Sequence, residues 1–225
     1  MNETVITVQG TYSHYQPAER ATVSLSVHHE SEQRQSAFTA TVAAADAVRA
    51  QITALHEGVA GHVTWWSSDQ VQVWSAKPWN NDGKQLPLVH HSRVTFRVKF
   101  KDFDALAQWS ESVAAVNGVA ISGVVWALTD ARKKELIDEV RTRAVQDAVA
   151  KASVYGASLG LGPVRAIAVA DPGMLGDGGS SESAPQLMTY ARSASIPDAG
   201  SGPALSFKPE DIEMSATVDV RFVAS

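Results

Sequence analysis

The strongest constraint on this sequence is one long amphipathic helix predicted between Thr129 and Gly160. Apolar side chains recur there every three to four residues, which places them on one stripe of a helix. The stripe consists of Leu136, Ile137, Val140, Ala144, Ala148, Ala152, Tyr155 and Leu159. Thr129 or Asp130 can cap the first turn, and Gly160 can end the helix in the left-handed conformation. Because several stripe residues are alanines, we expect another element to pack closely against residues 130–159.

Strand patterns surround this helix. Apolar runs at 119–128 and 163–170 flank it, and period-two alternation with one polar face marks half-buried strands elsewhere. The alternating segments are 21–29, 86–101 and 212–223. Shorter strand patterns occupy 4–10 and 63–75, the second with a polar interruption. We expect 63–75 and 86–101 to form a hairpin through a turn at Asn80–Gly83.

Two further helices complete the predicted fold. Residues 31–55 place Phe38, Val42, Ala45, Val48, Ile52 and Leu55 on one side. Asp102 can cap a helix whose inward residues are Phe103, Leu106, Trp109 and Val113. Hairpin neighbours with one polar face predict an α+β fold, a largely antiparallel or mixed sheet with helices packed on one face.

A chain of 225 residues can bury one sizeable core, and we expect a single domain over 1–225. Glycine, proline and serine accumulate between Pro172 and Pro209. A stretch of this length without helix or strand patterns is either functional or disordered. We therefore predict a flexible loop or arm at 172–209.

Composition excludes several classes of function. The net charge of −5 argues against a general nucleic-acid binder, so no nucleic-acid partner is expected. The absence of cysteine excludes disulfides, thiolate metal sites and a cysteine nucleophile. No apolar run approaches the ~20 residues of a transmembrane helix. The N-terminal segment has neither the basic nor the apolar region of a signal peptide, and we expect a cytoplasmic protein.

Two histidine pairs, His28–His29 and His90–His91, lie on predicted strands. Adjacent strand residues point to opposite faces, so neither pair can chelate a metal by itself. By alternation His28 and His91 share the polar phase, and His29 and His90 share the apolar phase. A zinc ion would need a third ligand, and the sequence offers none. We assign no metal or cofactor site, and expect exposed or strand-edge histidines; His56 and His62 are expected in solvent.

A basic stripe and a tryptophan cluster mark the predicted hairpin. Arg93, Arg97, Lys99 and Lys101 indicate either an anion-binding or nucleic-acid-binding surface or, as we expect, a strand face that is solvated or faces acidic residues of another subunit. The cluster consists of Trp65, Trp66, Trp74 and Trp79. Tryptophan is enriched at interfaces, and an oligomer contact, core packing and a small-molecule groove all remain open for these rings.

Gly156–Gly160 matches the G-x-S-x-G pattern of serine hydrolases. That chemistry needs the serine on a turn between a strand and a following helix. Here the pattern ends a helix and precedes a strand, so we assign no catalytic role to Ser158. No glycine-rich phosphate loop and no acid–base carboxylate pair stand out, and we assign no catalytic residues.

Several short motifs resemble the SIMPL-domain family, which includes the YggE-like periplasmic proteins of bacteria. They are Ser122-Gly123-Val124, Leu128-Thr129-Asp130, Ala144-Val145-Gln146-Asp147-Ala148, Lys151-Ala152 and Leu159-Gly160-Leu161-Gly162-Pro163-Val164. The opening strand Val5–Gly10 followed by Pro17–Val27 also matches. The family usually has an aspartate directly after that proline, where this chain has Ala18.

The resemblance implies an α+β fold and no catalytic residues. Family members are linked to stress tolerance, surface immunogenicity and, in an animal, signalling, and at least one forms a ring-like homo-oligomer. We therefore expect a non-enzymatic, self-assembling protein acting in stress protection. The arm at 172–209 and the tryptophan hairpin are the expected contact regions. The alternative is a binding module for a protein or small ligand, with the 172–209 loop ordering on contact.

Overall fold

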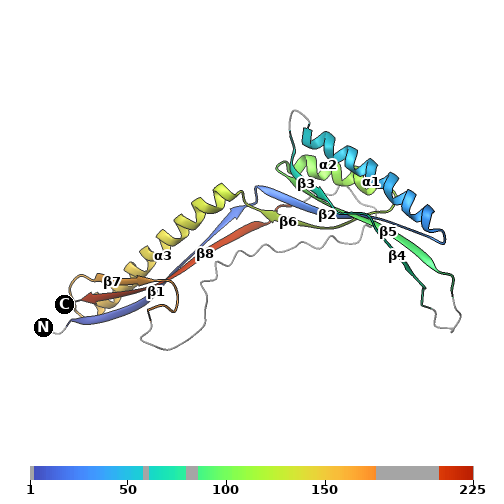
Figure 1. The fold of residues 1–225 in the computed structure, drawn as a ribbon. Helices are drawn as coiled ribbons and strands as arrows, with labels where there is room; N and C mark the ends of the chain where they lie inside the picture. Colours follow the sequence, from blue (N-terminus) through green and yellow to red (C-terminus); the bar gives the residue numbers. More distant parts are fainter. Residues whose placement is uncertain (1–2, 58–60, 80–85, 176–207, 225) are drawn as a thin grey trace. The chain divides into compact units, whose positions relative to one another are not determined.

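The computed structural model describes residues 3–57, 61–79, 86–175 and 208–224. The chain divides into two compact units, and each is a sheet with helices on it (Figure 1). Unit 1 comprises Met1–Pro17, Leu128–Ala191 and Asp211–Ser225; unit 2 comprises Ala18–Ala127 and Arg192–Glu210. The single-domain prediction for 1–225 stays a prediction, and most of the expected arm at 172–209 lies outside the described residues.

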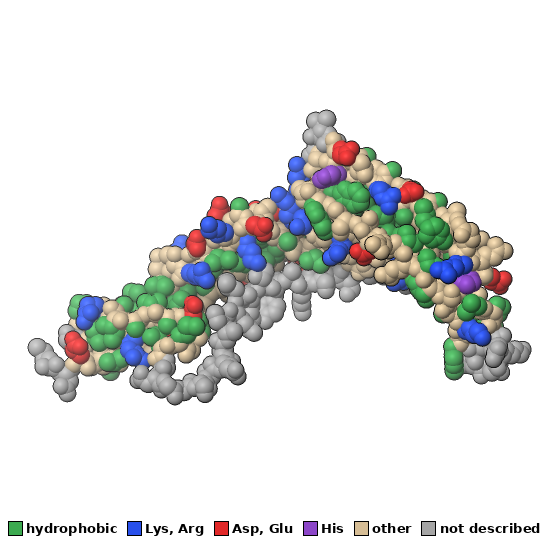
Figure 2. Space-filling view, viewed as in Figure 1, with side chains coloured by type: hydrophobic (Ala, Val, Ile, Leu, Met, Phe, Trp, Pro, Cys, Tyr) green, Lys and Arg blue, Asp and Glu red, His purple; other side chains and the backbone are tan. Residues whose placement is uncertain are grey.

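Unit 1 is a three-stranded antiparallel sheet with one long helix. Its elements are β1 (Thr4–Pro17), α3 (Asp130–Ser158), β7 (Arg165–Ala170) and β8 (Asp211–Ala224). The strand order is β1-β8-β7, and β1 pairs with β8 along the whole strand, from Thr4 opposite Ala224 to Pro17 opposite Asp211. Charged side chains of both signs cover the outer face of α3 (Figure 2).

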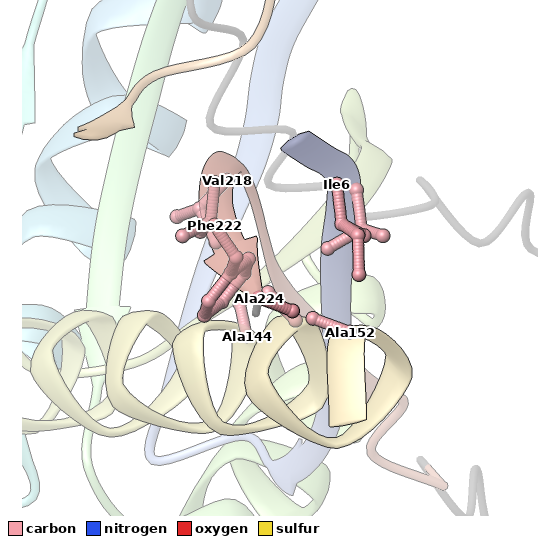
Figure 3. Packing of buried hydrophobic residues seen from close by; sticks show 9 residues of the cluster. Ile6, Ala144, Ala152, Val218, Phe222 and Ala224 are labelled. Carbon is pink, nitrogen blue, oxygen red and sulfur yellow. The ribbon is translucent and has the colours of Figure 1, made fainter. Parts of the chain in front are cut away.

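The core of unit 1 lies between the sheet and α3 (Figure 3). Alternation along β1 and β8 points every second side chain at the helix, and the residues of α3 that pack against them are small. The buried cluster consists of Ile6, Val8, Ala144, Ala148, Ala152, Val218, Val220, Phe222 and Ala224. A second cluster of Leu136, Val140 and Met214 continues this core toward the start of the helix.

Gly10 permits the closest approach in unit 1. A Cβ built at this position would overlap the carbonyl oxygen of Ala144 and lie 2.8 Å from the Cβ of Ala148. The alanine face of α3 thus rests directly on the backbone of β1. We predicted that the first strand ends at Gly10, but β1 continues to Pro17 because the glycine serves helix packing and does not form a turn.

The ends of α3 follow the predicted capping. Thr129 accepts a hydrogen bond from the backbone N–H of Arg132, and Gly160 takes a positive φ of 72°. The predicted stripe is buried through Ala152 except for the half-buried Ile137. Tyr155 and Leu159 are exposed, and Gly156 is buried in their place. Gly156 lies against Val164, where a Cβ would meet Val164 Cγ1 at 3.0 Å.

Unit 2 is a five-stranded antiparallel sheet with two helices on one face (Figure 1). Its elements are β2 (Arg20–Ser31), α1 (Arg34–Glu57), β3 (Val63–Ser68), β4 (Gln72–Ala76), β5 (Val89–Phe100), α2 (Phe103–Ala114) and β6 (Val119–Ala127). The strand order is β3-β5-β2-β6, and β4 pairs with β5 beyond the end of β3. Without β4, this is the β-α-β-β-α-β arrangement of ferredoxin-like folds.

Alternating residues of β2 and β5 build the core of unit 2. Val23, Leu25, Val27, Val94, Phe96, Val98 and Phe100 are all buried toward the helices. Helix α2 contributes the predicted Leu106, Trp109 and Val113. Helix α1 buries Ala37, Thr41, Ala45, Val48 and Ile52, whereas the predicted Phe38 stays exposed. The small side chains of Ala37 and Thr41 let α1 approach the sheet, and Thr41 donates a hydrogen bond to the Ser92 carbonyl.

The α+β prediction is confirmed, with two differences in arrangement. The structure contains two antiparallel sheets where the sequence indicated one, and the strands flanking α3 belong to different sheets. The polar interruption predicted within 63–75 lies at 69–71 and divides the segment into β3 and β4, which pair with successive parts of β5. The expected turn at Asn80–Gly83 lies outside the described residues.

None of the helices in the described part of the chain has the length and hydropathy needed to cross a membrane.

We expect Gly10→Ala to destabilise unit 1 by about 3 kcal/mol, because the added methyl group must displace α3 from β1. Urea unfolding followed by circular dichroism measures the loss. Gly123→Ala in β6 is the matched control, since a Cβ there meets nothing within 4 Å, and we expect a change within about 0.5 kcal/mol. Equal stability of the two variants would contradict the close approach of α3.

Candidate functional site

None of the described helices packs on one face of the unit 2 sheet, and we call this face the open face. Alternation places the polar residues of β2 and β5 on it, opposite the buried apolar set. The register aligns Lys99 with Thr22 and Trp65, and Arg97 with Ser24 and Ser67. The open face therefore combines cationic, hydroxyl and indole groups in neighbouring rows.

Three aromatic rings meet at one end of this face: His28 of β2, Trp74 of β4 and His91 of β5. Trp74 is paired directly with His91, and His28 lies diagonally across from it. The ring centroids are 5.1 Å apart for Trp74–His91, 5.4 Å for His28–His91 and 5.7 Å for His28–Trp74, and each pair is within 13° of parallel. His91 Nδ1 lies 3.3 Å from His28 Nε2 and 3.4 Å from a Glu30 carboxylate oxygen.

The surroundings of this ring cluster disfavour charge on His28. Burial lowers the pKa of His28 most, and the positive charges of Arg93 and His91 lower it further. Glu30 opposes these effects by raising it. A neutral His28 can stack on Trp74 and His91 without desolvating an imidazolium.

Two cations of β5 lie over indole rings. The Arg93 guanidinium carbon is 5.7 Å from the ring centroid of Trp74, and Lys99 Nζ is 5.8 Å from that of Trp65. Both distances fit a cation–π interaction, worth about 0.5–1 kcal/mol at exposed sites. Arg97 lies between them on the same face of β5. The predicted basic stripe thus exists, although Lys101 follows the end of the strand.

The four histidines of the predicted pairs separate as alternation indicated. His28 and His91 meet on the open face, whereas His29 lies 3.5 Å from Thr41 Oγ1 and His90 lies 2.7 Å from Ser75 Oγ. Within the described ranges no three His, Asp or Glu side chains converge in a way that could hold a metal ion. The nearly parallel His28 and His91 rings do not aim two nitrogen lone pairs at one point.

His56 and His62, which we expected in solvent, both have protein partners. His56 Nδ1 lies 2.9 Å from the Val63 carbonyl oxygen, and His62 Nδ1 lies 2.8 Å from Asp102 Oδ2. Asp102 also caps α2 by accepting a hydrogen bond from the Ala105 N–H. That cap bond, followed by the His62 contact, lowers the pKa of Asp102 despite partial burial.

The His62–Asp102 pair borders a shallow groove between α1 and α2. The groove encloses about 430 Å³ and is lined by Gln51, Asp104, Gln108, Trp109 and Ser112 among others. Trp109 Nε1 is buried and has no hydrogen-bond partner in the described part of the chain. Amide, hydroxyl and imidazole groups around an apolar floor suit a small polar ligand. Sequence reasoning identified the Asp102 cap but missed His62, because the two residues are far apart in the chain.

The G-x-S-x-G pattern lies where the sequence indicated, at the end of α3. Ser158 is the last helical residue, and its hydroxyl donates a hydrogen bond to the Val154 carbonyl. A nucleophilic serine needs the turn from a strand into a helix, and this one lies in the final turn before Gly160.

The tryptophans of the hairpin have different environments. Trp66 is half-buried on the helix side, Trp65 and Trp74 are 45% and 38% exposed on the open face, and Trp79 is 84% exposed beyond β4. The sequence predicted only that Trp65 and Trp66 point to opposite faces of the sheet. The placement of Trp74 beside His28 depends on the register of β4 against β5, which the sequence pattern did not define.

His28 makes stability depend on pH. Because its pKa is lowered in the folded state, the unfolded chain binds a proton more readily as pH falls below about 6.5. The free energy of unfolding of the unmodified protein should therefore fall between about pH 7.5 and pH 5.5 by more than that of His28→Gln. Urea unfolding across this range measures both profiles, and parallel profiles would contradict the ring cluster as described.

Asp102 stabilises α2 by capping its first turn. The direction of its pKa shift determines the pH range in which this stabilisation is present. The lowered pKa means that this stabilisation is present above about pH 4 and is lost as pH falls through the folded pKa. We expect Asp102→Ala to cost about 1 kcal/mol at neutral pH. The difference from the unmodified protein should shrink near pH 3, whereas Asp102→Asn, which keeps a capping oxygen, should cost less at neutral pH. A loss that persists unchanged at low pH would refute this assignment.

Comparison with protein-family models gives one match, over residues 6–222, described as SIMPL, protein of unknown function (DUF541). The match spans both units and nearly the whole chain. No curated protein matches the chain. The resemblance read from the motifs at 122–130 and 144–164 is confirmed, and the chain belongs to the SIMPL family (DUF541).

Proposed function

We propose that this chain is a non-enzymatic, self-assembling protein that forms a homo-oligomer. The ring-like form of the assembly and a role in stress protection come from the resemblance to family members. The structural support comes from large apolar side chains that remain exposed in groups on both units. Exposed apolar patches on a folded chain mark interaction surfaces more often than isolated apolar residues do.

The observation that carries the proposal is the exposed apolar surface at the end of the tryptophan hairpin. We use this name for the segment from Val63 to Phe100. Trp79 is 84% exposed there, and Leu88 is also exposed. An indole of this size buries a large area at low entropic cost when a second surface covers it. A second copy of the chain is the occupant we propose, because unit 1 offers an apolar surface of its own.

That surface of unit 1 surrounds β7 and the C-terminal half of α3, where hydrophobic side chains gather (Figure 2). The exposed side chains are Val149, Val154, Tyr155, Leu159, Ile167 and Val169. A groove of about 400 Å³ lies among them, lined by Ala157, Leu161 and Val164. In the described sheet, β7 pairs only with β8, so its other edge can accept another strand.

The groove between α1 and α2 favours a second candidate, a binding module for a small ligand or a protein partner. Its polar lining, which includes Gln51, Gln108 and Ser112, supports this alternative. The loop at 172–209, which we expected to order on contact, lies mostly outside the described residues. Recovery of one partner in a fixed ratio to the chain would favour binding over self-assembly.

We expect Trp79→Ser to shift the protein toward smaller species, because the assembled state loses a buried indole. Sedimentation velocity at several protein concentrations measures the distribution. Phe38→Ser is the matched control, since Phe38 is an exposed aromatic residue on α1 that belongs to neither of the two apolar groups named above. An unchanged distribution for Trp79→Ser, or an equal shift for both variants, would count against an interface at the hairpin.

A further inference from the structure

We propose that the open face of unit 2 binds single-stranded nucleic acid. In this proposal the cations of β5 contact phosphates, and Trp65 and Trp74 present ring faces to bases. None of these residues belongs to the Trp79 end of the hairpin or to the apolar surface of unit 1, so this inference does not rest on self-assembly.

The charge of the open face supports an anionic partner. Arg93, Arg97 and Lys99 lie on one face of β5, and both arginines are exposed. None of the three forms an ion pair with a carboxylate of the described residues. Like charges held on one strand face repel, so an anion that neutralises them is favourable.

The open face of unit 1 differs in this respect, although it belongs to a sheet of the same kind. Asp219 accepts hydrogen bonds from Gln9 and from the Gly173 N–H, and Arg221 donates to the Leu175 carbonyl. These two charges of β8 are thus bound within unit 1. In unit 2, Arg93, Arg97 and Lys99 share one strand face without an ion pair to a carboxylate among the described residues.

The positions of the rings favour a nucleic acid over other anions. Trp74 is paired with His91 and Trp65 with Lys99, so the two indoles lie beside the same edge of β5. From His91 to Lys99 the strand extends about 26 Å, at about 3.3 Å per residue. Cations and stacking rings along one track are what proteins use to bind single strands without sequence preference.

The surface between the cations and the indole rings carries short side chains. Thr22, Ser24, Ser26 and Thr95 occupy it, and Gly123 continues it onto β6. Short hydroxyl side chains let a flat base approach the sheet and can donate hydrogen bonds to phosphates. A four-stranded antiparallel face with two helices behind it is also the platform of RNA-recognition modules, a likeness in topology alone.

The net charge of −5 predicts weak binding but does not remove the local cations. Affinity for single strands depends on the phosphates contacted, and each contact contributes about −0.7 to the slope of log K against log salt. An acidic peptide could also neutralise β5, but it carries no flat bases and would make no use of the indoles. Dependence on tryptophan therefore separates the two partners.

The test is fluorescence anisotropy of a labelled 15-nucleotide oligothymidylate titrated with the full chain at about 50 mM salt. We expect saturable binding with a salt slope near −2, from three phosphate contacts. Arg97→Ala should reduce that slope by about 0.7. Trp65→Ala should weaken binding about tenfold, and Trp65→Phe should restore part of the affinity.

Charge reversal supplies the matched control. Arg93→Glu/Arg97→Glu should abolish binding, whereas Lys133→Glu/Lys134→Glu, with the same change of net charge on the exposed start of α3, should retain most of it. Circular dichroism confirms that each variant is folded. Three results would overturn the proposal. The first is no saturable binding at low salt, and the second is an equal loss of affinity in the two double variants. The third is full affinity in Trp65→Ala together with polyglutamate that competes as strongly as oligothymidylate.

Discussion

In the described part of the chain, helices cover each sheet on one face only, and the rest of the structure depends on that constraint. Strands with strict period-two alternation bury one face and leave the other polar. In unit 1 the covered face is sealed by α3, whose alanines rest on the backbone of β1 at Gly10. In unit 2 the covered face is sealed by α1 and α2. The uncovered faces are therefore the surfaces on which the two units can differ.

They differ in how their charges are satisfied. The charged pair of β8 in unit 1, Asp219 and Arg221, is bound by the backbone and side chains of its own unit. In unit 2, Arg93 and Lys99 of β5 lie over aromatic faces, which attract them weakly and do not neutralise their charge. The lowered pKa of His28 fits the same arrangement, because a positive charge on its ring would be repelled by the neighbouring Arg93.

Much of the fold follows from patterns of single elements. Alternation gave the correct faces of β2, β5 and β8, and capping residues gave the starts of α2 and α3. The buried row of α3 runs at intervals of four, from Leu136 to Gly156. Such a row is inclined to the helix axis, so it follows a twisted sheet and leaves Tyr155 and Leu159 outside.

Other features depend on partners that no local pattern identifies. In α1 the small Ala37 and Thr41 face the sheet instead of Phe38, because closeness of approach outweighs hydrophobicity at those positions. Alternation predicted that His28 and His91 lie on the same face of the sheet. It could not predict that Trp74 lies beside His91, because that depends on the register of β4 against β5. Likewise His62 meets Asp102 only through the packing of β3 beside β5.

Self-assembly is the central functional proposal, and the absolute mass of the unmodified chain in solution tests it most directly. Size-exclusion chromatography with light scattering measures that mass without assumptions about shape. We expect a mass several times that of the 24.0 kDa chain. A single species at 24.0 kDa, unchanged at high protein concentration, would contradict the proposal.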